Sequence, residues 1–219
     1  MAEMYSLHPE NPQARTVAQI QAALLHGAVM LYPTDTVYAI GCDINSKSAV
    51  QRVRQIKQSS NNKPLTFLCP SLSNIAQYAQ VSDSAYRIMR SLIPGPYTFV
   101  LPATKLVPRL VMDPKRKTTG IRVPDHVVSM SLLQALGNPI ISTSAHIDES
   151  DRNNGQKKQK NWSNTPSQAE LFERWDNLVD IIIDDGSEPE YQVSTILDLT
   201  EDEPKILRQG LGKLAFLPA

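Results

Sequence analysis

Residues 28–41 contain an apolar run, then a proline, then a polar cluster, and this order limits the local structures that the segment can form. The run 28–32 has the length of a buried strand, and Pro33 ends it because proline fixes φ and lacks a backbone donor. Two threonines and an aspartate follow at 34–36, before a second apolar segment at 37–41. This pattern predicts a strand, a polar turn and a second apolar segment. Polar strand ends are typical of ligand sites in α/β proteins, and the alternative is a local side-chain turn.

Apolar periodicity along the rest of the chain alternates between that of helices and that of strands. Helices are predicted at 13–26, 46–56, 73–78, 82–91, 127–136 and 169–178, and further strands at 64–68, 97–101, 120–123, 139–142, 179–183, 194–199 and 205–208. This alternation predicts an α/β fold, with one twisted mixed sheet flanked by helices. We expect a single domain over 1–219, with a polar mobile loop at about 147–168.

Composition excludes several classes of protein. The 22 basic and 22 acidic residues balance, so the overall charge gives no attraction to nucleic acid or membrane. Cys42 and Cys69 form no CxxC pair and the histidines lack metal-ligand spacing, which predicts neither a disulfide framework nor a structural metal. No secretory pattern opens the chain and no apolar run is long enough to cross a membrane. We therefore expect a cytoplasmic protein.

Positive charge is concentrated locally in residues 105–122, where six basic residues accompany the single acid Asp113. Lys115, Arg116 and Lys117 are its centre. Such a window is either a solvated face or a rim that binds anions such as RNA phosphates.

The common phosphate-binding motifs are missing. The sequence contains neither a P-loop nor a GxSxG elbow, and Gly210-x-Gly212 is too short for a dinucleotide fingerprint. A nucleotide would have to be held by cations and hydroxyls next to strand ends, although each of these also has a structural alternative as an ion pair or a cap. The candidates are Lys57, Arg122, Arg208, Thr118, Ser142, Ser144, Ser194 and Thr195.

Seven blocks, spread in order over residues 12–212, resemble the YrdC-type threonylcarbamoyl-adenylate synthase family, and its YciO-like branch most closely. The blocks are YPTDTVY at 32–38, Lys57 with KPL at 63–65, PGPYT at 94–98, TTGIRVP at 118–124, SAH at 144–146, STILD at 194–198 and LRQG at 207–210.

The resemblance implies a YrdC-like α/β fold around a deep basic cavity. The implied reaction joins L-threonine, bicarbonate and ATP into threonylcarbamoyl-adenylate and releases pyrophosphate. That product serves the N6-threonylcarbamoyl modification of adenosine 37 in transfer RNAs that read ANN codons. The implied macromolecular partners are transfer RNA or double-stranded RNA and other proteins of tRNA modification.

The resemblance also implies roles for particular residues. Threonine would be held by Thr36, Arg122, Ser144 and Ser194, and ATP by Lys57, Lys63, Thr118, His146 and Arg208. Lys57 and Arg122 would be catalytic through charge neutralisation and positioning, without a covalent protein intermediate. Mg²⁺ would arrive on the ATP phosphates rather than in a protein metal site.

The sequence departs from the active branch of that family at several motif positions. The Lys-x-Arg pair reads Lys57-Gln58-Ser59, and the other departures are Ala39, Lys63, Leu68 and His146. Lys63 supplies a charge but not the two-pronged geometry of arginine. Three functions stay open: a synthase with reduced activity, a protein that binds double-stranded RNA or nucleotide without efficient synthesis, and a protein that shares only the fold.

Overall fold

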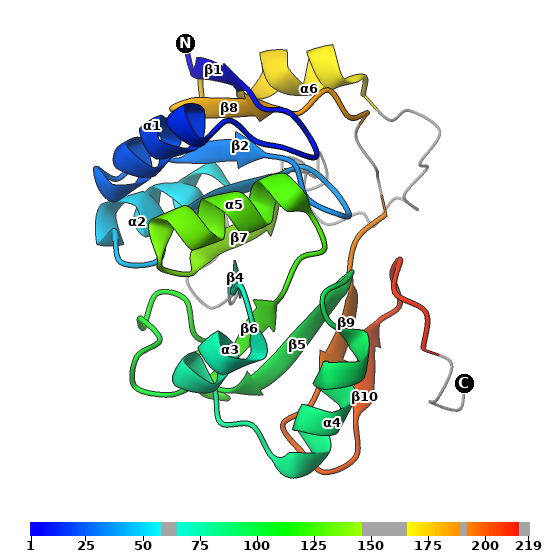
Figure 1. Cartoon of the computed structure of the whole chain (residues 1–219). Helices are drawn as coiled ribbons and strands as arrows, with labels where there is room; N and C mark the ends of the chain where they lie inside the picture. Colours follow the sequence, from blue (N-terminus) through cyan, green and yellow to red (C-terminus); the bar gives the residue numbers. More distant parts are fainter. Residues whose placement is uncertain (58–64, 146–165, 189–191, 215–219) are drawn as a thin grey trace, which may run out of the picture.

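The computed structural model describes residues 1–57, 65–145, 166–188 and 192–214. Within them, ten strands form one mixed sheet in the order β1-β8-β2-β3-β7-β4-β6-β5-β9-β10 (Figure 1). The strands are β1 Glu3–Ser6, β2 Met30–Tyr32, β3 Ala39–Asp43, β4 Thr66–Leu68, β5 Tyr97–Pro102, β6 Thr118–Arg122, β7 Ile140–Ser144, β8 Ile181–Asp184, β9 Thr195–Asp198 and β10 Lys205–Arg208.

Six helices connect these strands in the described residues. They are α1 Ala14–Leu25, α2 Lys47–Ile56, α3 Leu72–Tyr78, α4 Asp83–Leu92, α5 Val127–Leu136 and α6 Gln168–Trp175. Four of them begin at a serine whose side chain accepts a backbone N–H of the first turn, which supplies a partner that a helix N-terminus otherwise lacks. These serines are Ser46, Ser71, Ser82 and Ser167.

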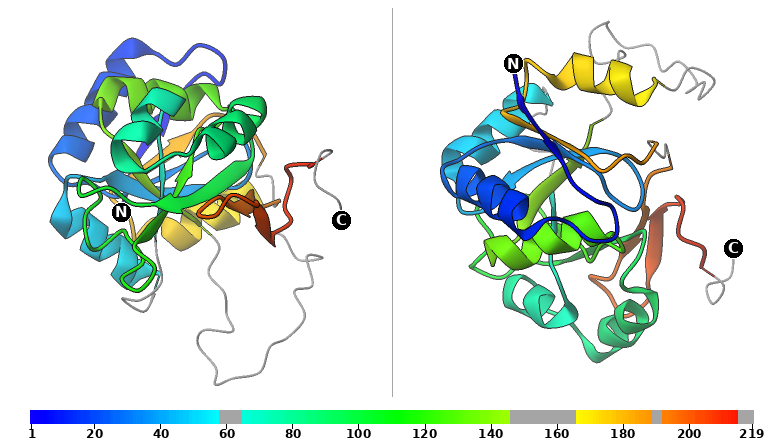
Figure 2. Two further views of the ribbon diagram at one scale, coloured as in Figure 1. Left: turned by 90° about the horizontal axis from the view of Figure 1, so that it is seen from below. Right: turned by 45° about the horizontal axis from the view of Figure 1, so that its top comes forward.

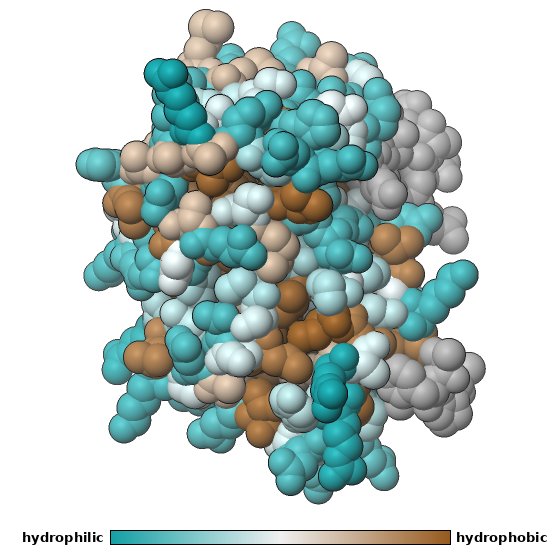
Figure 3. All heavy atoms as spheres, in the orientation of Figure 1, coloured by the Kyte–Doolittle hydropathy of each residue, from teal (hydrophilic) through white to brown (hydrophobic). Residues whose placement is uncertain are grey.

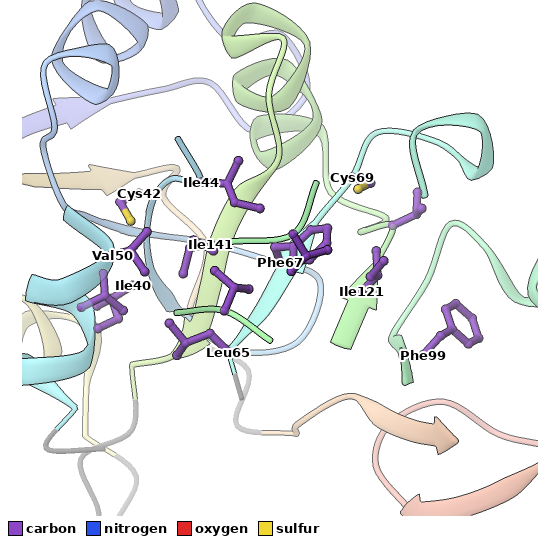
Figure 4. Packing of buried hydrophobic residues seen from close by; sticks show 14 of the residues in the cluster. Ile40, Cys42, Ile44, Val50, Leu65, Phe67, Cys69, Phe99, Ile121 and Ile141 are labelled. Carbon is purple, nitrogen blue, oxygen red and sulfur yellow. The ribbon is translucent and has the colours of Figure 1, made fainter. Parts of the chain in front are cut away.

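Alternation along the strands divides the core into two clusters. In β2, Met30 and Tyr32 point to the face covered by α1 and α5, whereas Leu31 joins the opposite cluster, which contains residues of α2 and α6. Figure 4 shows part of that second cluster, including Ile141 of β7 and Phe67 of β4. Residues 66–68 and 140–144 therefore present their even-numbered side chains to the α1 and α5 side.

A very short strand joins the two parts of the sheet. β4 pairs antiparallel with β7 and parallel with β6, through three residue pairs on each side. On the β7 side lie β1, β8, β2 and β3, and on the β6 side lie β5, β9 and β10. The right panel of Figure 2 shows the edge strand β10 (red) well separated from α6 (yellow).

The sequence-based prediction of a mixed α/β sheet is confirmed, and most predicted elements lie within a few residues of the observed ones. β1 was not predicted; it pairs in parallel with β8 at the edge of the sheet. The strand predicted at 179–183 begins two residues later, at Ile181, and ends at Asp184. Most of the predicted loop at 147–168 lies outside the described residues, and its last residue, Gln168, already belongs to α6.

The surface shown in Figure 3 is mostly hydrophilic, with apolar atoms concentrated in its lower half. Within the described ranges, no helix combines the length and apolar character needed to cross a membrane.

Candidate functional site

The polar segment after β2 forms a turn that is fixed at its start and within itself. Ser129 of α5 donates its hydroxyl to the Pro33 carbonyl at 2.8 Å. Thr34 Oγ1 donates to the Val37 carbonyl at 2.7 Å and accepts from the Thr36 backbone N–H at 3.2 Å. The local side-chain turn that was predicted as the alternative is therefore present. Its hydrogen bonds fix the backbone that carries Asp35 and Thr36.

The end of this turn is anchored to Asp185, the residue that follows β8. Tyr38 donates its hydroxyl to Asp185 Oδ1 at 3.4 Å, and His126 Nε2 lies 3.2 Å from Asp185 Oδ2. Burial raises the pKa of Asp185, but the contact with His126 and hydrogen bonds from Ser187 outweigh burial and lower it to about 2. Asp185 is thus a carboxylate at neutral pH and holds both α5 and the segment after the turn.

Arg122, at the end of β6, extends from the other part of the sheet to this turn. Its Nη1 donates to Thr36 Oγ1 at 2.8 Å, and its Nε donates to the Gly95 carbonyl at 3.3 Å. Nη2 lies 2.5 Å from Asp35 Oδ1, with both side chains about nine-tenths buried. This ion pair lacks hydrogen-bond alignment: Nη2 and both Asp35 oxygens have no hydrogen-bond partner among the described residues.

A second arginine arrives from β10. Arg208 donates from Nε and Nη2 to the Ser194 carbonyl at 3.0 and 2.7 Å, and from Nη2 to Ser194 Oγ at 3.2 Å. Ser194 Oγ also shares a 2.8 Å hydrogen bond with Thr98 of β5, the strand that pairs with β6. Burial and the positive charge of Arg122 lower the pKa of Arg208. We call Asp35, Thr36, Thr98, Arg122, Ser194 and Arg208 the arginine site.

The segment that follows Arg208 is packed tightly against β9. Thr195 Oγ1 donates to the Gly212 carbonyl at 2.7 Å and accepts from the Gly210 N–H at 2.9 Å. A Cβ atom at Gly210 would lie 2.2 Å from the Val193 carbonyl oxygen, so only glycine permits this approach. The predicted Gly-x-Gly pair therefore holds the backbone next to Arg208 and Ser194.

Lys57 and the serines of β7 lie on the β2 side of the sheet. Lys57 Nζ donates to the Ser144 carbonyl at 3.0 Å, and Tyr32 donates its hydroxyl to Ser142 Oγ at 2.8 Å. Burial raises the pKa of Tyr32, while the hydrogen bond with Ser142 and the charge of Arg122 oppose that rise.

Two other predicted groups lie along β6 from Arg122. Thr118 is buried and shares a strand face with Arg122, but four residues of strand separate them by roughly 13 Å. Lys115, Arg116 and Lys117 form an exposed turn before Thr118, where Arg116 pairs with Asp198 at 2.7 Å. These three residues thus belong to a separate surface. Lys63, His146 and Ser59 lie outside the described residues.

The described ranges contain no cluster of three or more histidine, cysteine or acidic side chains able to hold a metal ion. Asp35 is the polar residue at this site that sequence reasoning left without a role. Its place between two threonines at a strand end was the available signal.

The family model described as "Telomere recombination" (Sua5_yciO_yrdC) matches residues 22–210. The chain belongs to the Sua5/YciO/YrdC family. This confirms the predicted resemblance and places the arginine site within the matched region.

Both branches of the family are represented among similar proteins. "Uncharacterized protein YciO" of Escherichia coli is 37% identical over 212 residues, covering 97% of each chain, and its crystal structure has a TM-score of 0.86 with 98% of each chain covered. A threonylcarbamoyl-AMP synthase of Klebsiella pneumoniae is 34% identical over 140 residues, covering 63% of this chain and 73% of the relative. A P. abyssi Sua5 structure complexed with L-threonine has 25% identity and a TM-score of 0.80, covering 95% of this chain and 58% of that one. The YciO-like branch is thus the nearer of the two.

Proposed function

We propose that this protein is a threonylcarbamoyl-adenylate synthase that joins L-threonine, bicarbonate and ATP. The supporting observation is the convergence of Arg122 and Arg208 with the hydroxyls of Thr36 and Ser194 at strand ends. Guanidinium groups bind anions through two parallel hydrogen bonds, and Arg122 and Arg208 come to this site from β6 and β10. The synthases among its relatives and the threonine complex of a Sua5 structure support the choice of substrates.

In the proposed reaction, the threonine nitrogen first combines with bicarbonate to give a carbamate and water. An oxygen of that carbamate forms a bond to the α-phosphorus of ATP, and the bond to the pyrophosphate oxygen breaks. Negative charge grows on the phosphates, so fixed cations are the main catalytic requirement.

The residues divide between the two substrates in this proposal. Thr36, Arg122, Ser144 and Ser194 hold threonine, and Lys57, Lys63, Thr118, His146 and Arg208 hold ATP, with Mg²⁺ entering as part of the ATP complex. The direct test incubates the purified protein with ATP, Mg²⁺, bicarbonate and labelled threonine. Threonine-dependent release of pyrophosphate with formation of the adenylate supports the proposal, and the absence of both products contradicts it.

Replacing Arg208 or Lys57 with Ala should weaken ATP binding by about 1.5–3 kcal/mol, the range for hydrogen bonds to charged groups. Calorimetric titration with ATP and Mg²⁺ measures this change. Lys205→Ala is a matched control, because Lys205 lies on the same strand and pairs only with the exposed Glu201 in the described structure. Unchanged affinity in both site variants would place the nucleotide elsewhere.

The exposed turn at Lys115, Arg116 and Lys117 favours a second candidate function, in which the protein binds double-stranded RNA or transfer RNA without efficient synthesis. The turn is held by Asp113, whose Oδ1 accepts the backbone N–H groups of Lys115 and Arg116 at 2.8 and 2.9 Å. Lys115 and Lys117 are thereby held beside Arg116, which is paired with Asp198, in an exposed turn that a phosphate backbone can approach.

Changing Lys115, Arg116 and Lys117 to Glu should lower RNA affinity and reduce the salt slope by roughly 0.9 for each phosphate that the protein no longer neutralises. Fluorescence anisotropy with a short RNA duplex at several salt concentrations measures both. The control reverses the exposed Arg15, Arg87 and Arg90, which changes the net charge equally. If both triple variants behave alike, or if the unmodified protein shows no salt-sensitive binding, the turn is a solvated face.

A further inference from the structure

The turn after β2 is held at both ends by contacts that meet at one carboxylate, Asp185. At the far end of the turn, Tyr38 donates its hydroxyl to Asp185 Oδ1 at 3.4 Å. At the near end the connection has two steps, through His126, which caps α5, and through Ser129 in the first turn of that helix. Asp185 is only 3% exposed, so both ends of the turn depend on a charge inside the protein.

The connection at the near end requires one particular form of the His126 ring. Nδ1 accepts the Ser129 backbone N–H at 3.4 Å, and the Ser129 hydroxyl donates to the Pro33 carbonyl at 2.8 Å. A ring nitrogen that accepts a hydrogen bond carries no proton, so the ring proton lies on Nε2, which is 3.2 Å from Asp185 Oδ2. The carboxylate favours this tautomer, because it attracts a proton on Nε2 and would repel a lone pair there.

We propose that Asp185 is a positioning residue for the arginine site: it fixes the tautomer of His126 and thereby the turn that carries Thr36. This assignment rests on the proposed function, in which Thr36 helps to hold threonine. Arg122 Nη1 donates to Thr36 Oγ1 at 2.8 Å, and such a hydrogen bond weakens steeply when its two groups are misaligned. Asp185 thus acts on the site through the turn and not by touching a substrate.

Ser129, His126 and Asp185 are the residue types of a nucleophilic triad, but their contacts exclude that role. The ring nitrogen that is turned away from Asp185 is Nδ1, and it already accepts a backbone N–H, so it cannot take a proton from a hydroxyl. The Ser129 hydroxyl is fully buried and donates to the Pro33 carbonyl instead of to the ring. The three residues therefore support the turn.

Asp185→Asn tests the tautomer directly. Asp185 Oδ1 accepts the backbone N–H and the hydroxyl of Ser187 at 3.1 and 2.5 Å, so the Asn oxygen should take that side and its amide nitrogen should face His126. His126 Nε2 must then accept a hydrogen bond, which moves the ring proton to Nδ1 and removes the cap of α5. Long-range proton–nitrogen NMR spectra of the histidine rings, recorded slightly above neutral pH, measure this change. A proton on Nδ1 in the unmodified protein, or an unchanged ring in the variant, overturns the proposal.

Hydrogen exchange measures the effect on the turn. The Thr36 backbone N–H donates to Thr34 Oγ1 at 3.2 Å, and its exchange should become faster by about fivefold or more in Asp185→Asn, since a helix cap is lost. Asp43→Asn is the matched control, because Asp43 is also a buried aspartate, whose Oδ1 accepts the Asn45 backbone N–H at 2.9 Å. Equal changes in the two variants would indicate a general loss of stability and contradict the proposal.

His126→Asn provides a rescue that does not depend on a tautomer. Asn is among the most favourable residues at a helix N-cap, because its side-chain oxygen accepts a backbone N–H. The double variant Asp185→Asn with His126→Asn should therefore regain slow exchange at Thr36. Exchange in the double variant as fast as in Asp185→Asn alone would exclude the route through the cap of α5.

Kinetics relate the turn to the proposed reaction. Asp185→Asn should raise KM for threonine by about fivefold or more and leave KM for ATP within about twofold, because the turn carries a residue that holds threonine. Equal increases in both KM values contradict the positioning role. The tautomer and the exchange rates are measured on the protein alone. If no variant makes the adenylate, the proposed function fails, and these two measurements still decide whether Asp185 controls the turn.

Discussion

Replacing Arg122 with Met is expected to lower threonine-dependent pyrophosphate release at least about a hundredfold, since removing one preorganised donor at a site of developing charge costs roughly 10²–10³ in rate. Methionine retains much of the length of the side chain but cannot donate to Thr36 or attract an anion. Steady-state kinetics at saturating ATP measures the loss. Activity within a few-fold of the original would exclude Arg122 from the reaction.

The same substitution should reduce the free energy of unfolding by about 3–5 kcal/mol, because it leaves the buried Asp35 carboxylate without its counter-charge. The double variant Asp35→Asn with Arg122→Met should recover most of that stability and none of the activity. Urea denaturation measures both values. Arg116→Met is the control: Arg116 is 49% exposed in its ion pair with Asp198, and exposed pairs contribute about 0–1 kcal/mol.

Ser59→Arg is expected to raise adenylate formation by about tenfold to a thousandfold, the range for one added charge-stabilising donor. Ser59 lies outside the described residues, so this prediction rests on the sequence. Ser59 follows Lys57 by two residues, at the position where the active branch of the family has arginine. Arginine would restore the two parallel hydrogen bonds to a phosphate that serine cannot make. The threonine-dependent pyrophosphate assay measures the gain.

Two further variants determine what an increase means. Ser59→Lys adds the charge without the fork, so it should recover less activity than Ser59→Arg if the paired hydrogen bonds matter. Combining Ser59→Arg with His146→Asn shows whether these two departures from the family pattern act together. If no variant exceeds the unmodified protein, the missing arginine does not limit the reaction, and RNA or nucleotide binding becomes the better account.

Local patterns in the sequence were sufficient for most elements of the fold. The strand that ends before Pro33 and the helix that ends before Gly137 are both present. Proline and left-handed glycine end such elements through the backbone geometry of adjacent residues alone. β1 was missed for the same local reason. Its four residues are mostly exposed and too few to show a period, and its pairing with Ile181 to Asp184 lies far along the chain.

The arginine site illustrates what local patterns could not provide. Each of Thr36, Arg122, Ser194 and Arg208 was a candidate from its place at a strand end, but their partners depend on strand order. The Thr36–Arg122 hydrogen bond spans 86 positions. The unaligned contact with Asp35 depends on side-chain geometry that no spacing rule encodes. The basic turn was predictable from its run of charges. Its distance from the arginine site was not, because it follows from the structure, in which the turn and Arg122 lie at opposite ends of β6.

The short strand β4 has a consequence for how the molecule folds. Its three pairs with β7 and three with β6 join the two parts of the sheet that supply the arginine site. These pairs close shorter loops of chain than the pairing of β8 with β1 and β2, so loop entropy does not delay them relative to the rest of the sheet. Ligand affinity should appear only once both parts are joined. A ligand that contacts both parts should stabilise the chain as one cooperative unit, by about 2.7 kcal/mol at a hundred times its dissociation constant, and raise its melting temperature accordingly.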